Sequence, residues 1–160
     1  MMTDIKLKGL RRNKRNGFSL IELLIVVAII LIIAAIAIPN FLHARIAANE
    51  STAVSSIHAI NTSEIAYSSA YPMVGYSATL ADLGPTVSGY LDSVLAAGTK
   101  NGYAFTYVQD TSATPSVGYT VNADPVTRGT TGQRSFFSNQ ANVTHYNMTA
   151  VSTVTDPSIQ

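Results

Sequence analysis

The most apolar stretch of the chain runs from Phe18 to Ile38 and contains a single charged side chain, Glu22. As a helix, these residues would extend for about 31 Å, which is enough to cross the hydrocarbon core of a bilayer. The part from Leu23 to Ile38 is apolar on all sides, as is typical of a helix surrounded by lipid or buried among other helices. The pattern therefore predicts a membrane-spanning helix over residues 18–38.

A periodic pattern of apolar positions continues beyond this stretch. Spacings of seven, four, three and seven residues place them on one face of a helix: Ile46, Ala53, Ile57, Ile60 and Tyr67. Polar residues fall on the other faces: Asn49, Glu50, Ser55, Ser56 and His58. We therefore predict an amphipathic helix over residues 39–71, which ends before Pro72 because a residue that precedes a proline disfavours the helical conformation.

Pro39 lies where the two helical patterns meet. Because it lacks the N–H group that would bond to the carbonyl of Ala35, we expect it to kink or loosen one long helix of about 80 Å. The alternative is that Pro39 simply ends the membrane-spanning helix. The amphipathic pattern that starts directly after Pro39 favours the continuous helix.

Residues 72–160 are rich in Gly, Ser, Thr and Tyr and contain short alternating runs. Alternation predicts strands over residues 102–109, 118–123 and 133–138, with a possible edge strand over 143–147. A loop over 71–84 with one helical turn and a short helix over 92–97, closed by Gly98, precede them. Turn-forming residues separate the strands at 110–116, 124–125 and 129–132, and we expect the last dozen residues to form a loosely held tail.

The predicted fold class is α+β. A long N-terminal helix, with an apolar protruding half and an amphipathic second half, packs on a small antiparallel sheet of three to four strands. Four segments follow from this pattern: residues 1–17, the apolar helix 18–38, the amphipathic helix 39–71 and the β-rich globular domain 72–160.

The composition excludes several classes of reactive and metal-binding site. Charged residues make up only 12% of the chain and there is no cysteine, which excludes disulfides, thiolate metal sites and cysteine nucleophiles. The three histidines, His43, His58 and His145, are far apart, and no phosphate-binding loop, nucleophile elbow or His-Glu metal motif occurs. We therefore predict no enzyme activity, no cofactor and no metal site. Asp110, Asp124 and Asp156 fall in predicted loops without the alternating oxygen ligands of a calcium loop.

The charge is divided unevenly along the chain. Residues 1–17 carry six Lys or Arg and one Asp, a net charge of +5, whereas residues 18–160 carry four Lys or Arg and eight Asp or Glu, a net charge of −4. The positive-inside rule leaves residues 1–17 in the cytoplasm and exports the C-terminal part. Because the basic run lies only in this leader, no specific nucleic-acid binding is predicted.

Three interpretations of the apolar segment remain. A cleaved secretory signal would use Ala35-Ile36-Ala37 as its cleavage site, but the segment is long for that purpose. A plain membrane anchor leaves Glu22 unexplained, because a carboxylate in hydrocarbon requires a partner. The third interpretation supplies that partner.

The residues Arg15-Asn16-Gly17-Phe18-Ser19-Leu20-Ile21-Glu22-Leu23 resemble the class III signal of type IV pilins and type II secretion pseudopilins, and the close match covers residues 11–41. The resemblance implies that a prepilin peptidase cleaves between Gly17 and Phe18 and then methylates the amino group of Phe18. Glu22 would stand fifth after cleavage, and Pro39 would be the twenty-second residue. A pilus assembly platform and its ATPase are further partners that the resemblance implies.

The resemblance extends to Gly102–Tyr107 and Gly132–Phe137 in the globular domain. It implies a major pilin that starts as a single-pass inner-membrane protein with a periplasmic C-terminal domain. The subunit would then form a homopolymeric extracellular filament for adhesion and twitching motility, and Glu22 of one subunit would meet the amino group of Phe18 in a neighbour. The alternative is a major pseudopilin in a periplasmic pseudopilus. The absence of cysteine departs from the many pilins that close their C-terminal loop with a disulfide.

Overall fold

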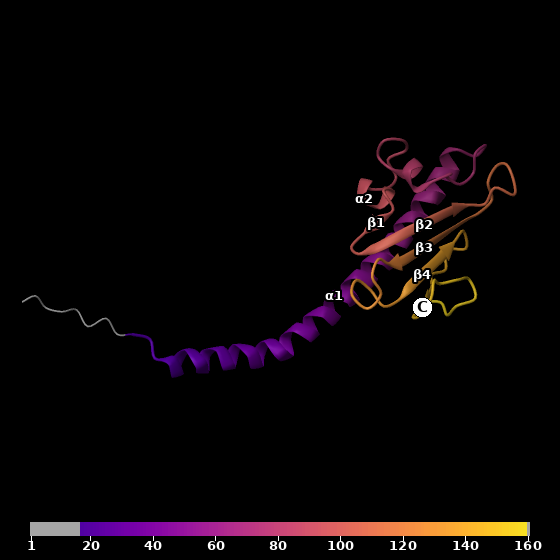
Figure 1. Cartoon of the computed structure of the whole chain (residues 1–160). Coiled ribbons are helices and arrows are strands. Elements are labelled where there is room, and N and C mark those ends of the chain that lie inside the picture. Colours follow the sequence, from indigo (N-terminus) through magenta and orange to yellow (C-terminus); the bar gives the residue numbers. More distant parts are fainter. Residues whose placement is uncertain (1–16, 160) are drawn as a thin grey trace, which may run out of the picture. The chain divides into compact units, whose positions relative to one another are not determined.

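The computed structural model describes residues 17–159, so the predicted leader, apart from Gly17, lies outside the described residues. The chain first forms one long helix and then short helical turns and a sheet (Figure 1). In chain order, the elements are α1 (Leu20–Ala70), the 3₁₀ turn η1 (Leu80–Leu83), α2 (Ser93–Ala96), β1 (Thr99–Lys100), β2 (Tyr103–Gln109), β3 (Tyr119–Pro125), β4 (Ser135–Asn139) and β5 (His145–Asn147).

The chain divides into two compact units, of which the first ends at Ile38 and the second begins at Pro39. Helix α1 continues through Pro39 without a break, so the alternative that this proline ends the helix is wrong. The kink at Pro39 stays a prediction. Helix α1 ends at Ala70, and Tyr71, the residue before Pro72, is no longer helical, as the restriction on residues that precede proline requires.

All five strands form one antiparallel sheet with the order β1-β2-β3-β4-β5. The α+β class is confirmed, but the sheet has one strand more than the three to four predicted. The additional strand, β1, has two residues and is too short to show an alternating pattern. The predicted turn at 124–125 is wrong because Asp124 and Pro125 pair with Ala104 and Tyr103 at the end of β3.

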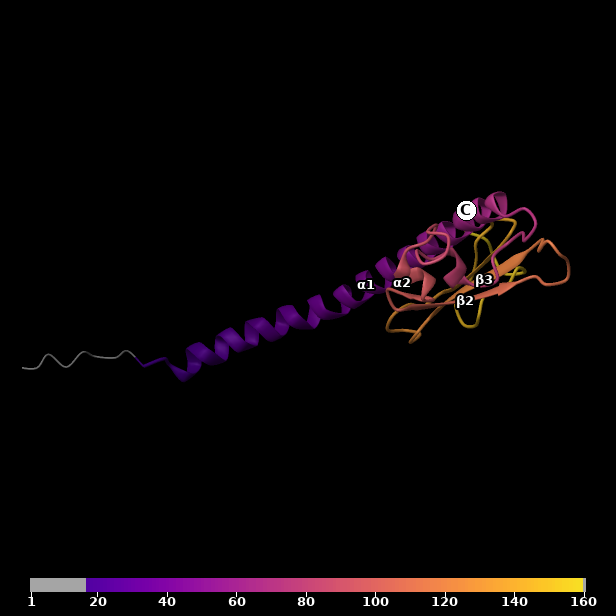
Figure 2. The ribbon, with the colours of Figure 1, turned by 90° about the horizontal axis from the view of Figure 1, so that it is seen from above.

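The core of the second unit lies between α1 and one face of the sheet (Figure 2). Three residues of the predicted apolar stripe, Ala53, Ile57 and Ile60, are buried, while Ile46 and Tyr67 are half-buried. Alternate residues of the central strands meet them: Tyr103, Phe105, Tyr119, Val121, Ala123 and Phe136. The helical period of 3.6 residues places the apolar side chains of α1 on one face, and the strand period of two residues places those of the sheet on one face. These two faces pack against each other.

The last dozen residues do not form the loose tail that we expected. The N–H of Tyr146 donates to the carbonyl of Pro157, and the N–H of Ile159 donates to the carbonyl of Thr144. The guanidinium of Arg128 donates to the carbonyls of Met148 and Ala150, and Ser152 is buried. Backbone groups of the tail find these partners only in the folded domain, which is why a polar composition gave no sign of them.

Candidate polymerisation segment and its anchor

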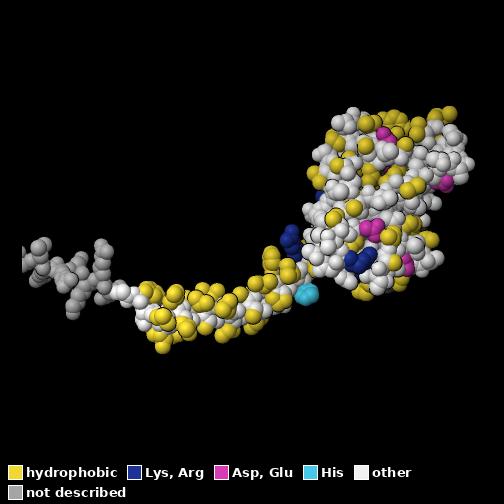
Figure 3. Space-filling view, in the orientation of Figure 1, with side chains coloured by type: hydrophobic (Ala, Val, Ile, Leu, Met, Phe, Trp, Pro, Cys, Tyr) yellow, Lys and Arg dark blue, Asp and Glu magenta, His cyan; other side chains and the backbone are white. Residues whose placement is uncertain are grey.

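The first part of α1 presents an apolar surface that nothing in the described chain covers. Each large apolar side chain from Phe18 to Ile38 is at least 45% exposed. Figure 3 shows hydrophobic atoms over the visible side of this helix. By length and composition, α1 is the one described helix that is apolar enough to cross a membrane.

Such a surface is unfavourable in water. Each Å² of apolar area that is removed from water contributes about 25 cal/mol, and soluble monomers rarely expose long contiguous apolar surfaces. The segment from Phe18 to Ile38 therefore requires lipid or other protein chains around it. Either environment, lipid or protein, accepts a helix, because the backbone N–H and C=O groups of a helix hydrogen-bond to one another.

The residues predicted for processing lie at the start of this helix. Gly17 and Phe18 precede α1 and are exposed, and among the described residues beyond its chain neighbours no atom lies within 4 Å of a Cβ atom added at Gly17. The backbone at this position is thus open to a protease. Ser19 accepts the first helical hydrogen bond through its carbonyl, from the N–H of Leu23 at 3.2 Å.

Glu22 occupies the first turn of α1, where the positive end of the helix dipole stabilises a carboxylate. We predicted a helix from residue 18, but α1 begins at Leu20, so Phe18 is outside the helix. The order Ser19-Leu20-Ile21-Glu22 matches the capping-box pattern, which is a local reason for a helix to begin at Leu20. The partner of Glu22 stays a prediction.

Sequence reasoning missed the polar residues that hold α1 in the globular domain. We expected Glu50 on a face away from the apolar stripe, and it is only 6% exposed. Its Oε1 accepts the N–H groups of Gln133 (2.9 Å) and Arg134 (3.0 Å). Its Oε2 accepts Nε of Arg134 at 2.8 Å, which completes an ion pair.

The surroundings of Glu50 favour its charged form. Burial raises the pKa of Glu50, but the backbone N–H groups of Arg134 and Gln133 and the Arg134 side chain outweigh burial, so its pKa lies below the ordinary value. Arg134 also lies over the rings of Phe136 and Tyr146, at 5.4 and 5.6 Å from their centroids. A carboxylate on α1 and a cation on the loop before β4 are therefore held together.

Further polar side chains of α1 are buried. Asn61 donates to Ser138 Oγ (2.9 Å) and Asn142 Oδ1 (2.8 Å), and its Oδ1 accepts the hydroxyl of Tyr119 at 2.8 Å. Glu64 is fully buried and accepts both the N–H and the hydroxyl of Ser77. Ser56, which we also expected on another face, is buried as well.

These contacts fix one face of α1 along the globular domain. The only sequence signal was the presence of Asn and Glu within an apolar helical pattern, and that signal did not distinguish a buried side chain from a solvated one.

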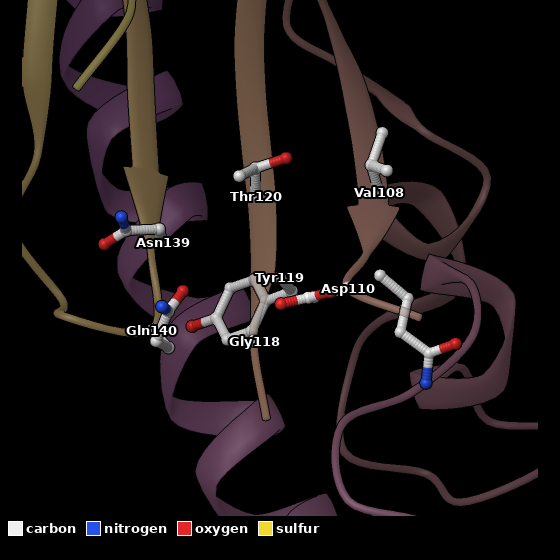
Figure 4. Close-up of a pocket in the computed structure, with 8 residues that line it drawn as sticks. Val108, Asp110, Gly118, Tyr119, Thr120, Asn139 and Gln140 are labelled. Carbon is white, nitrogen blue, oxygen red and sulfur yellow. The ribbon is translucent and has the colours of Figure 1, made fainter. Parts of the chain in front are cut away.

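Within residues 17–159, no group of three or more His, Asp or Glu residues is placed to hold a metal ion. Asp110 follows β2, Asp124 belongs to β3, and Asp156 accepts hydrogen bonds from Asn147 and Thr153 in the C-terminal segment. A pocket of about 250 Å³ lies where β2, β3 and β4 meet their loops (Figure 4), with Asp110, Tyr119 and Gln140 among its lining residues.

Known proteins match the N-terminal signal and part of the chain. Residues 12–38 match the family model described as the prokaryotic N-terminal methylation motif. The type IV major pilin protein PilA of Myxococcus xanthus strain DK1622 is 53% identical over 55 residues, which are 34% of this chain and 25% of that protein. The match thus covers about a quarter of the length of this relative. No solved structure matches.

The motif covers Gly17, Phe18 and Glu22 together with the exposed apolar helix, and the relative is a type IV pilin. The other interpretations of the segment, a secretory signal cleaved near Ala37 or a plain anchor, do not account for this motif. The methylation motif, the identity to a type IV major pilin over 55 residues and the α+β domain with its exposed apolar helix together support a type IV pilin with a class III signal.

Proposed function

We propose that this protein is the major structural subunit of a type IV pilus. A prepilin peptidase cleaves the precursor between Gly17 and Phe18, and the same enzyme methylates the new amino group of Phe18. The mature subunit then polymerises through α1 into an extracellular filament that serves adhesion and twitching motility.

The observation that carries this proposal is the uncovered apolar surface from Phe18 to Ile38, which follows the cleavage position of a class III signal directly. In the membrane, lipid covers this surface. In a filament, the same surface of neighbouring subunits covers it, so that extraction from lipid exchanges one apolar environment for another. A homopolymer is the arrangement in which each helix finds that cover.

Glu22 supplies register in this proposal. A carboxylate inside an apolar helical bundle is unfavourable unless a cation meets it, and the amino group of Phe18 in a neighbouring subunit is such a cation. A subunit that docks out of register leaves both charges unpaired. The pairing therefore selects one axial position among the many that an apolar surface alone would accept.

The apolar helix and the uneven charge also predict where the subunit is located in the cell. Before assembly, the subunit is a single-pass inner-membrane protein with the globular domain in the periplasm, and the assembly platform and ATPase are its further partners. The pseudopilin alternative uses the same helix, but the relative that matches is a type IV major pilin, which favours the pilus. A structural subunit needs no catalytic residues.

The first experiment distinguishes a pilus subunit from a pseudopilus subunit. Cells that express the full chain are sheared, and the intact mass and N-terminal sequence of the protein are determined in the extracellular and envelope fractions. We expect an extracellular polymer that begins at N-methylated Phe18. Processed chain confined to the envelope would contradict the pilus and favour the pseudopilus, and a start at Ile38 or an uncut chain would contradict the assignment altogether.

A variant of the cleavage site provides the control. Gly17→Val places a branched side chain where the peptidase approaches the backbone, so full-length precursor should accumulate in the membrane. Gly17→Ala adds one methyl group and should impair cleavage less. Normal cleavage of Gly17→Val would refute the processing step.

A further inference from the structure

The second unit, residues 39–159, has two ends that contacts define. At the first end, Asn49 Nδ2 donates to the carbonyl of Thr131, and Glu50 binds Gln133 and Arg134. At the other end, the N–H of Ser116 donates to the carbonyl of Val74, just beyond the end of α1. We call the end with residues 39–50 the basal end and the end with residues 71–76 and 110–118 the distal end.

Strand β2 connects these ends in the same direction as α1. It begins next to Gly102, where an added Cβ atom would lie 3.6 Å from Asn49 Nδ2, and it ends at Gln109, whose Nε2 donates to the carbonyl of Tyr76 at 2.7 Å. From Arg45 to Ala70, α1 rises about 38 Å. The two ends are thus separated by most of the length of the domain.

The basal end presents a cation without a partner. Arg45 is exposed, and the two ion pairs among residues 17–159 involve other cations, Lys100 and Arg134. One turn before Arg45 on the same helix face, the ring of Phe41 is 66% exposed. Leu42 beside it is also exposed.

The distal end presents the complementary groups. Asp110 is exposed, and its Oδ1 accepts one hydrogen bond, from the N–H of Ser112, while no described cation pairs with it. Met73 is 84% exposed, and Val74 next to it is also exposed. A hollow of about 290 Å³ adjoins Asp110 on the side of Met73, and the pocket in Figure 4 adjoins it on the side of β3.

Asp82, Asp92 and Asp156 already have more partners within the chain than Asp110 has. Asp82 accepts the N–H and the hydroxyl of Thr79, and Asp92 already pairs with Lys100. Asp156 accepts Asn147 and Thr153. Among the exposed carboxylates of residues 39–159, Asp110 therefore has the most free hydrogen-bonding capacity.

We propose that the distal end of one subunit binds the basal end of a second copy, with Asp110 of the first paired to Arg45 of the second and Phe41 packed against Met73 and Val74. The inference rests on the proposed function and adds the contact that joins the globular domains. Because the two surfaces differ, the contact is heterologous and repeats without closing, as an open filament requires. Paired copies are displaced by about 38 Å along α1.

A charge exchange tests the pair in cells that express the full chain. Arg45→Asp and Asp110→Arg should each lower the amount of sheared filament about fivefold, because like charges replace an exposed ion pair. The double variant R45D/D110R should restore the filament. As a matched control, Lys100→Asp makes the same change in charge at an intramolecular pair and should leave the amount of filament within twofold of the unchanged chain. A double variant no better than the single ones would overturn the pairing.

Cross-linking tests the contact without altering the charges. The chain contains no cysteine, so Ala48→Cys and Thr111→Cys together introduce one thiol at each end. Both positions are exposed, and each is close in sequence to one member of the pair. A short bismaleimide reagent should convert filaments of the double variant into a ladder of multimers, whereas either single variant stops at the dimer.

The two levels of the proposal fail in different ways. Filaments that contain the double-cysteine chain but give no ladder would overturn the contact and leave the pilus intact. Processed chain that forms no filament even without any substitution would overturn the proposed function itself.

Discussion

Removal of the Glu50 carboxylate tests how α1 is held in the globular domain. Glu50→Ala leaves two backbone N–H groups, those of Gln133 and Arg134, without their acceptor, and it breaks an ion pair in which the Glu50 side chain is 8% exposed. Breaking a buried pair typically lowers stability by about 3–5 kcal/mol. The Arg134 side chain is 35% exposed and keeps its contacts with Phe136 and Tyr146, so we expect a loss of about 2–4 kcal/mol.

The assay is urea unfolding of the full chain in detergent, followed by the fluorescence of the buried tyrosines. Lys100→Ala is the control, because it breaks the exposed pair with Asp92 and should lower the free energy of unfolding by less than about 1 kcal/mol. If Glu50→Ala destabilises the domain no more than Lys100→Ala does, Glu50 does not anchor α1.

The pH dependence gives a second measure of the same contact. The pKa of Glu50 is lowered in the folded state, so its contribution is fully present above the unfolded value of about 4.3 and is lost as the pH falls through the folded value. Glu50→Gln carries no titrating group at this position. The loss of stability below about pH 4.3 should therefore be smaller in Glu50→Gln than in the unchanged chain, and equal slopes would contradict the pKa shift.

Three further outcomes are expected. Gly132→Ala would make Cβ clash with the hydroxyl of buried Tyr103 and should destabilise the domain by about 1–3 kcal/mol in the same urea assay, whereas Gly118→Ala meets only the flexible end of an exposed glutamine and should have a smaller effect. Arg128→Ala removes the donor that holds the C-terminal segment and should speed amide hydrogen exchange there, with unchanged exchange in the core strands as the control. Glu22→Ala should permit cleavage and methylation but reduce sheared filament, and abundant filaments from this variant would contradict its pairing role.

Local sequence patterns determined the main elements of this protein. The apolar run and its flanking charges, the helical spacing of Ala53, Ile57 and Ile60, and the proline at 72 all act within a few residues of one another. The same holds for the alternation in β2 and for the motif around Gly17. Each of these features is visible in sequence because the physical cause is local.

Only the tertiary structure decided which polar residues of α1 are buried. Glu50 finds its partner in Arg134, 84 positions along the chain, and Asn61 bonds to Ser138, 77 positions away. Contacts between distant positions also order the C-terminal segment. Strand β1 pairs with nearby β2, and it escaped prediction because two residues show no alternation. A polar side chain within a helix carries no local mark of a distant partner, and it is buried only where the fold supplies hydrogen bonds that replace those of water.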